Sequence, residues 1–163
     1  MPEVVERTAR LIAQWQAVGW AHGVMNTDNM SIHGITLDYG PFGFMDDYDP
    51  GFICNHSDHN GRYAFNQQPY IGLWNLSCLA QALLPLAAKE DLKASLDRYT
   101  PLCERRYMEL MRAKFGLSEE EEEDAGLIQD LLSLMQQSRV DYTSFFRALG
   151  TFSSQDGSPN EPL

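Results

Sequence analysis

The chain has 163 residues, of which 44% are hydrophobic and 21% are charged, and its formal net charge is −11. This length and composition suit one globular domain that can bury a hydrophobic core. The acidic balance argues against nucleic acid as a main partner, because phosphate binding depends on clustered Lys and Arg. The same balance leaves room for bound cations.

The sequence also argues against a membrane location. The most apolar run, from Cys78 to Ala88, contains Gln81 and Pro85 and is too short to cross a bilayer. From Met1 the chain leads straight into an amphipathic pattern, so we expect no signal peptide. Its 3 cysteines are widely spaced and form no C-x-x-C pair, which favours reduced thiols and a cytoplasmic protein.

The first predicted element is a helix from about Glu3 to Ala17. Its apolar positions recur at steps of three and four residues, which is typical of one buried helix face, and they are Val4, Thr8, Leu11, Trp15 and Val18. Gly19 is expected to end this helix. Residues 22–29 are too polar and irregular for a packed element, so they predict a loop.

A small β-hairpin is predicted next. Residues 30–32 and 35–37 alternate between apolar and polar side chains around His33-Gly34, which fits a two-residue turn. In that register Asn29 stands directly opposite Asp38, and residues so placed have Cβ atoms about 4.5–5.5 Å apart. An amide oxygen and a carboxylate at that separation can share a hard cation such as Mg²⁺. The alternative is that Asn29 and Asp38 satisfy backbone groups at strand ends or turns.

The rest of the chain divides into a long irregular segment and a helical part. Residues 38–70 are rich in Gly, Pro, Asn, Asp and aromatic residues, and a segment of this kind in a compact domain tends to be functional. The remaining predicted helices are residues 71–86, residues 92–111 with a restart at Thr100-Pro101, residues 118–135 with a capping box of Ser118 and Glu121, and residues 140–149. We therefore expect a mainly α fold with a small β-hairpin over residues 1–152, and a disordered tail over residues 153–163.

The loop and the hairpin carry a kinase-like motif. Protein kinases have H-R-D-x-x-x-x-N followed by D-F-G, and the Asn and the second Asp hold magnesium. His22 and Asn29 keep the first spacing, and Asp38-Tyr39-Gly40 occupies the second position. Val24 replaces the usual catalytic Asp and cannot accept a proton, which argues against ordinary kinase chemistry. Asp28 is the obvious substitute.

The wider sequence is similar to the selenoprotein O family. The similarity is carried by H-G-V-M-N-T-D-N-M-S at residues 22–31, D-Y-G-P-F-G-F at residues 38–44, D-D-Y at residues 46–48, P-G-F-I-C-N-H-S-D at residues 50–58 and G-R-Y at residues 61–63. The resemblance is close over residues 4–84 and looser beyond. It implies the C-lobe part of a protein-kinase-like fold that binds ATP in a flipped orientation and transfers AMP to Ser, Thr or Tyr hydroxyls of proteins.

The same resemblance assigns roles to individual residues. Asp28 would be the proton acceptor, Asn29 a magnesium ligand, and Asp38 a contact of both magnesium and nucleotide, with Mn²⁺ as a possible replacement. The family fold is bilobal, and neither a glycine-rich phosphate loop nor a Lys–Glu pair is found here. We therefore expect a missing N-terminal lobe and little or no transferase activity in the isolated chain.

Two other functions fit parts of the sequence. A small-molecule phosphotransferase of the aminoglycoside-kinase type would carry H-G-D-x-x-x-x-N, which His22-Gly23 fits and Val24 does not. A non-catalytic scaffold or binding module would keep the lobe without the activity.

A cluster of potential zinc ligands lies further along the chain, at Cys54, His56, Asp58 and His59. A structural zinc site usually needs a second ligand pair, which this cluster lacks. We therefore favour loop hydrogen bonding with Asn55 and Arg62 over a zinc site.

Overall fold

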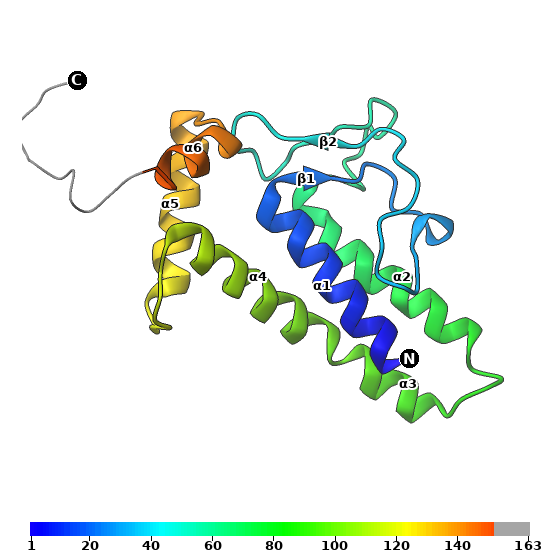
Figure 1. Cartoon of the computed structure of the whole chain (residues 1–163). Coiled ribbons are helices and arrows are strands. Elements are labelled where there is room, and N and C mark those ends of the chain that lie inside the picture. Colours follow the sequence, from blue (N-terminus) through cyan, green and yellow to red (C-terminus); the bar gives the residue numbers. More distant parts are fainter. Residues whose placement is uncertain (152–163) are drawn as a thin grey trace, which may run out of the picture.

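The computed structural model describes residues 1–151, and the predicted tail at residues 153–163 lies outside the described residues. In chain order the elements are α1 (Pro2–Val18), β1 (Trp20–Ala21), the 3₁₀ helix η1 (Thr27–Asn29), β2 (Gly43–Phe44), the 3₁₀ helix η2 (Phe65–Gln67), α2 (Gln68–Ala82), α3 (Lys89–Leu96), α4 (Tyr99–Phe115), α5 (Asp124–Ser138) and α6 (Tyr142–Leu149). The fold is mostly helical, as predicted (Figure 1). Within residues 1–151 no helix is both long enough and apolar enough to cross a membrane.

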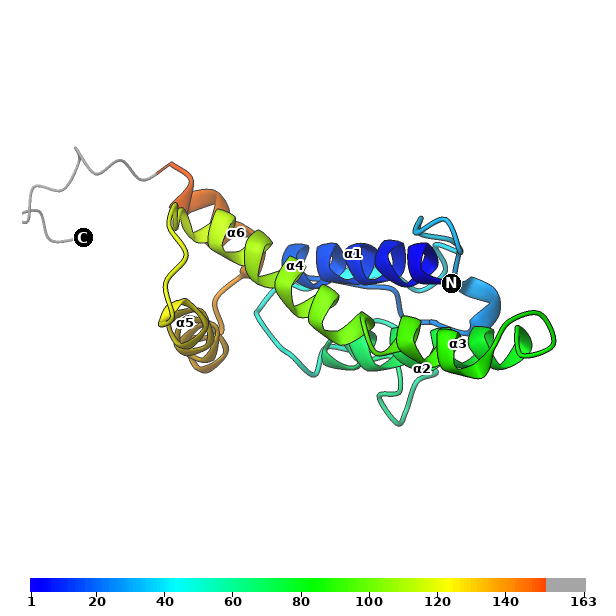
Figure 2. The ribbon, with the colours of Figure 1, turned by 90° about the horizontal axis from the view of Figure 1, so that it is seen from below.

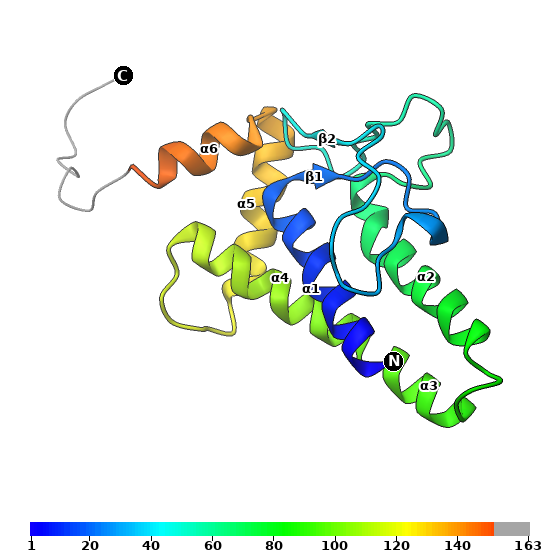
Figure 3. The same cartoon turned by 45° about the vertical axis from the view of Figure 1, so that its right-hand side comes forward.

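Helix α1 packs against both α2 and α4, and its contacts with α4 are the more extensive (Figure 3). The predicted helix is confirmed, and it ends at Gly19, whose φ of 70° is a left-handed conformation that glycine adopts readily. The predicted buried face is right only in part, because Thr8 and Trp15 are buried whereas Val18 is exposed. The buried face of α1 is completed by Val5, Ala9, Ile12, Ala13 and Ala17.

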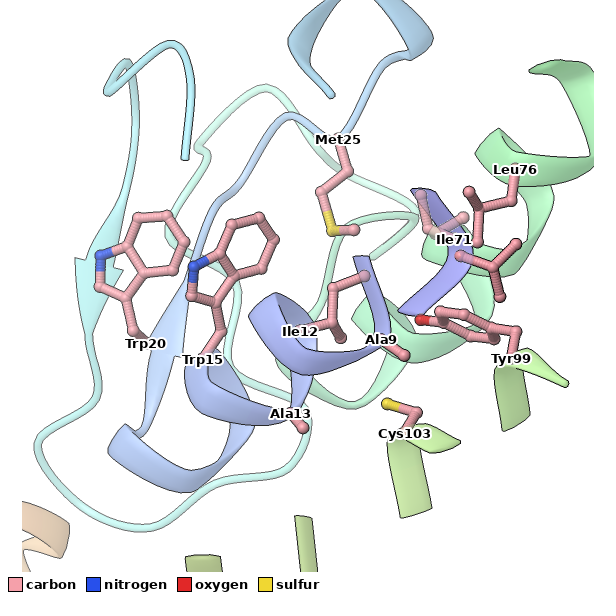
Figure 4. Packing of buried hydrophobic residues seen from close by; sticks show 11 residues of the cluster. Ala9, Ile12, Ala13, Trp15, Trp20, Met25, Ile71, Leu76, Tyr99 and Cys103 are labelled. Carbon is pink, nitrogen blue, oxygen red and sulfur yellow. The ribbon is translucent and has the colours of Figure 1, made fainter. Parts of the chain in front are cut away.

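Two hydrophobic clusters form the core. The first joins α1, β1, α2 and the start of α4, and in it the ring centroids of Trp15 and Trp20 lie 4.8 Å apart (Figure 4). The second joins the end of α4 to α5 and α6, which lie at one end of the described fold (Figure 2). Tyr142 of α6 and Ala17 at the end of α1 both belong to this second cluster, and the Tyr142 hydroxyl donates a 3.0 Å hydrogen bond to the carbonyl oxygen of Ala17.

The helix starts differ from the predictions, and the start of α5 differs most. The capping box of Ser118 and Glu121 is wrong, because α5 begins only at Asp124. The buried Asp124 instead accepts a 3.1 Å hydrogen bond from the backbone N–H of Glu121. The predicted restart at Thr100-Pro101 falls slightly earlier, between α3 and α4, so that Pro101 lies in the first turn of α4, where its missing N–H costs no helical bond.

The predicted hairpin is mostly wrong. The small antiparallel sheet is formed by β1 and β2, with Trp20 opposite Phe44, whereas residues 30–37 contain a single bridge between Met30 and Thr36. That bridge shifts the expected register by one residue, because the backbone N–H of Gly34 bonds to the carbonyl oxygen of Ser31 and the turn is longer than two residues.

The sides on which the residues of segment 30–37 lie also differ from the predicted alternation. Thr36 lies inward, since its hydroxyl accepts a 3.1 Å hydrogen bond from Nε1 of the buried Trp15. Ile32 and Ile35 are 51% and 54% exposed, although both are apolar positions of the predicted alternation. The mainly α fold with a small antiparallel sheet is therefore confirmed, and its kinase-like C-lobe character stays a prediction.

Candidate active site

His22 opens the loop that carries the kinase-like motif, and its ring is almost completely buried. Its Nδ1 accepts a 3.3 Å hydrogen bond from the backbone N–H of Val24, which assigns the proton to Nε2. Nε2 then donates a 2.8 Å hydrogen bond to the carbonyl oxygen of Leu37. Burial lowers the pKa of His22 below its ordinary value, so the ring is neutral at pH 7. Through this bond His22 holds the residue before Asp38 against the loop.

Gly23 lies where the loop touches two other segments. Its φ is 82°, and a Cβ at this position would lie 2.7 Å from both the sulfur of Cys54 and the carbonyl oxygen of Pro41. A larger residue would therefore push the loop away from the segment that follows Asp38.

Gln68, the first residue of α2, anchors the start of the loop. Its side chain is fully buried, and its Oε1 accepts a 2.8 Å hydrogen bond from the backbone N–H of His22. Its Nε2 donates a 3.0 Å hydrogen bond to the carbonyl oxygen of Trp20. One amide thus satisfies two backbone groups on either side of Ala21, where the chain passes from β1 into the loop.

Three asparagines hold the next three residues of the loop. The carbonyl oxygens of residues 23, 24 and 25 accept hydrogen bonds from the side-chain amides of Asn55 at 3.1 Å, Asn29 at 3.0 Å and Asn75 at 3.0 Å. Tyr63 adds a hydrogen bond from its hydroxyl to Oδ1 of Asn26. Side-chain hydrogen bonds therefore hold the backbone of residues 20 and 22–25, and one more holds the side chain of Asn26.

Gln68 and Asn75 were not predicted as residues of the site. A signal for Asn75 was present, since it is an amide within the apolar run that predicted the helix of residues 71–86. A buried amide in such a position must find hydrogen-bond partners, which makes it a structural or functional residue. Gln68 precedes Pro69 at the helix start and carried no comparable signal.

The structure places the predicted site residues around this loop. Asp28 is exposed in η1, and Asp38 is exposed with a φ of 55°. Asn29 donates through Nδ2 to Val24, so its Oδ1 points elsewhere and is available as a ligand. Asn29 and Asp38 are not the directly opposed pair that was predicted, because the bridge at Met30 shifts the register. They are instead tied to the loop separately, Asn29 through Val24 and Asp38 through the contact of Leu37 with His22.

The two predicted metal ligands, Asn29 and Asp38, both offer oxygen donors, an amide oxygen and a carboxylate. Such a set suits Mg²⁺ or Mn²⁺ better than zinc. Within residues 1–151, no 3 or more His, Cys, Asp or Glu side chains lie close enough together to hold a metal ion. The side chains of the cluster at residues 54–59 are likewise not grouped in this way.

The cluster at residues 54–59 takes part in hydrogen bonding within its own loop. Both carboxylate oxygens of Asp58 accept backbone N–H groups, from Arg62 at 2.9 Å and from Tyr63 at 2.7 Å. Because Tyr63 also bonds to Asn26, this loop supports the candidate site. The loop hydrogen bonding that was favoured over zinc is therefore present.

Comparison with known proteins identifies the family. Residues 1–162 match the family model described as "Protein adenylyltransferase SelO". The chain belongs to the SelO family. The resemblance predicted from residues 22–63 is therefore confirmed.

Individual SelO-family relatives give the same picture. A protein of Myxococcus xanthus called "Protein nucleotidyltransferase YdiU" is 64% identical over 161 residues, which cover 99% of this chain and 33% of that protein. Proteins of the same name from Thioalkalivibrio sulfidiphilus and Aliivibrio fischeri are 63% and 60% identical, and the matches cover 91% and 94% of this chain and 32% of each relative. The chain thus spans about a third of the length of these curated relatives.

Proposed function

We propose that this chain forms the catalytic-loop part of a cytoplasmic, Mg²⁺-dependent protein nucleotidyltransferase. The whole enzyme would transfer AMP from ATP to Ser, Thr or Tyr hydroxyls of other proteins, and the remaining length found in the relatives would supply the N-terminal lobe. The observation that carries this proposal is the fixed loop of residues 20–26, which holds Asn29 and Leu37-Asp38 on one short stretch of backbone.

Asp28 is the proposed proton acceptor. In the transfer, the hydroxyl oxygen of the acceptor protein bonds to the α-phosphorus of ATP, the bond from that phosphorus to the bridging oxygen breaks, and pyrophosphate leaves. The hydroxyl proton passes to the exposed carboxylate of Asp28. His22 does not serve this purpose, because its two ring nitrogens are already engaged with Val24 and Leu37.

Oδ1 of Asn29 and the carboxylate of Asp38 would hold the magnesium ion. When bound, the cation neutralises charge on the phosphates. The hydrogen bond from Nδ2 of Asn29 to the carbonyl oxygen of Val24 supports this role, since it directs Oδ1 of the same amide away from that carbonyl group. Manganese is compatible with the same oxygen donors.

A chimera tests the proposal directly. The matching third of the Myxococcus xanthus relative is replaced by this chain, and the product is incubated with ATP, Mg²⁺ and a generic acceptor protein. Mass spectrometry should detect added AMP with the chimera, and little or none with the isolated chain. The variant Asp28→Asn should lower labelling by about 100-fold or more, the range typical for loss of a proton acceptor. Asp38→Asn should also lower labelling, because the magnesium ion loses its carboxylate ligand. Asp97→Asn, at an exposed position in another part of the fold, serves as the matched control.

A non-catalytic scaffold remains the second candidate, because Val24 stands where kinases carry their catalytic Asp. A folded chimera that fails to label acceptors, beside a relative that labels them, would favour the scaffold. Labelling that survives Asp38→Asn would contradict the proposed site.

A further inference from the structure

Arg62 is an exposed arginine in the loop that precedes η2, and its position is fixed by its neighbours. The central carbon of its guanidinium lies 4.8 Å from the ring centroid of Trp74 in α2 and 5.6 Å from that of Tyr63. An aromatic face attracts a cation at such distances. Asp58 holds the backbone N–H groups of Arg62 and Tyr63 at 2.9 Å and 2.7 Å. The charged group is therefore positioned without help from another molecule.

The charge of Arg62 has no acidic partner within residues 1–151. Most arginines in that part of the chain form an ion pair with a carboxylate, as Arg139 does with Asp47. The carboxylate of Asp58 bonds to backbone groups instead of the guanidinium. The N–H groups of the Arg62 side chain can therefore bind an acid of another molecule, and the planar guanidinium matches the shape of a carboxylate.

Tyr63 links this arginine to the proposed proton acceptor. Its hydroxyl bonds to Oδ1 of Asn26, which directly precedes η1, and Asp28 is the middle residue of η1. The hydroxyl of an acceptor protein must reach Asp28 to transfer its proton. Because an extended chain advances about 3.3 Å per residue, residues a few positions from that hydroxyl come within reach of Arg62.

We propose that Arg62 binds an acidic side chain of the acceptor protein, a few residues before or after the hydroxyl that receives AMP. This inference rests on the proposed function and adds to it a class of acceptor, namely proteins with an acidic residue near the modified one. The phosphates of ATP are the other anions at the site. They are assigned to the magnesium held by Asn29 and Asp38, which are tied to the loop by bonds that do not involve Tyr63.

Acceptor peptides tested on the chimera measure the preference for an acid. Each peptide carries a single Ser, and one position within a few residues of it is Glu, Gln or Lys in otherwise identical sequences. At one or more of these positions, kcat/KM should be about fivefold higher for the Glu peptide than for the Gln peptide, as expected for an exposed ion pair.

Variants of the chimera assign this preference to Arg62. Arg62→Gln should remove the preference without changing the KM for ATP. Arg62→Glu should favour the Lys peptide over the Glu peptide at the same position, because the charge at the protein surface is then reversed. Arg98→Gln, at another exposed arginine without an acidic partner in residues 1–151, should keep the preference for Glu.

The possible failures are distinguishable. Equal labelling of the Glu and Gln peptides, or a preference for Glu that survives Arg62→Glu, would overturn this inference and leave the proposed function standing. A raised KM for ATP in Arg62→Gln would also overturn it, because Arg62 would then bind a phosphate. A folded chimera that labels none of the peptides would contradict the proposed function and this inference together.

Discussion

Replacing Gln68 by Leu should be among the most damaging changes near the candidate site. The side chain is fully buried, and it alone bonds both the carbonyl oxygen of Trp20 and the backbone N–H of His22. Leucine has a similar volume, so the substitution removes hydrogen bonds without opening a large cavity. The effect on stability should therefore come from two buried backbone groups that lose their partners.

The expected loss of stability follows from the number of buried backbone groups that lose a hydrogen-bond partner. A buried donor or acceptor left without a partner costs about 1–3 kcal/mol, so two such groups give a loss of about 2–6 kcal/mol. The total free energy of unfolding of a domain is usually about 5–15 kcal/mol. Gln68→Leu should consequently remove a large share of the stability. Gln67→Leu, at the neighbouring exposed position, should change it by less than about 0.5 kcal/mol.

Urea denaturation followed by circular dichroism measures the loss, and amide hydrogen exchange locates it. In Gln68→Leu the amide of His22 should exchange faster relative to the amides of α4, because the loop opens locally as well as with the whole fold. A loss below about 1 kcal/mol, or unchanged relative protection of His22, would refute the role assigned to Gln68.

Two further substitutions test the packing of α1. Gly72→Ala should destabilise the fold by about 1–3 kcal/mol in thermal or urea unfolding, because a Cβ there would lie 2.3 Å from Ile12 and 2.5 Å from the hydroxyl of Tyr99; a neutral effect would show that α1 and α2 can separate freely. Lys114 donates to the carbonyl oxygen of Ala17, and burial lowers its pKa from 10.5 to about 8. The unfolded chain therefore binds more protons between these values, and the stability of the wild type relative to Lys114→Met should rise with pH over that window. A flat difference would mean that the rings of Tyr142 and Phe146, which lie 4.3 and 3.8 Å from the ammonium nitrogen, stabilise its charge enough to offset burial.

The helices were predictable where a local signal determined them. The spacing of apolar residues and the glycine at position 19 predicted α1 to within one residue at each end, because both signals act within a few residues of the chain. The face of α1 was less predictable, since it depends on how α2 and α4 approach it. Alanines at positions 9 and 13 are buried for that reason, although they add little to a hydrophobic pattern.

The ribbon around Asn29 and Asp38 shows where local reasoning failed. Alternation of apolar and polar residues predicted a hairpin in which Ile32 and Ile35 share one apolar face, but a hydrogen bond from Trp15 draws Thr36, a polar residue of that pattern, inward. That contact joins residues 21 positions apart, so no short pattern could show it. The family resemblance found the same candidate residues, because it rested on the motif and not on the register.

The order along the chain of the side chains that hold the loop of residues 20–26 has a consequence for biosynthesis. Four of the residues that fix positions 20–26, namely Asn55, Tyr63, Gln68 and Asn75, follow the loop in the sequence. A chain made from its N-terminus leaves the ribosome with this stretch still unanchored, and the stretch can take its final shape only when α2 has emerged. Helix α4, the main partner of α1, emerges later still. A premature stop within α2 would therefore release a peptide that carries the motif of residues 22–29 but lacks some of the hydrogen bonds that fix its backbone.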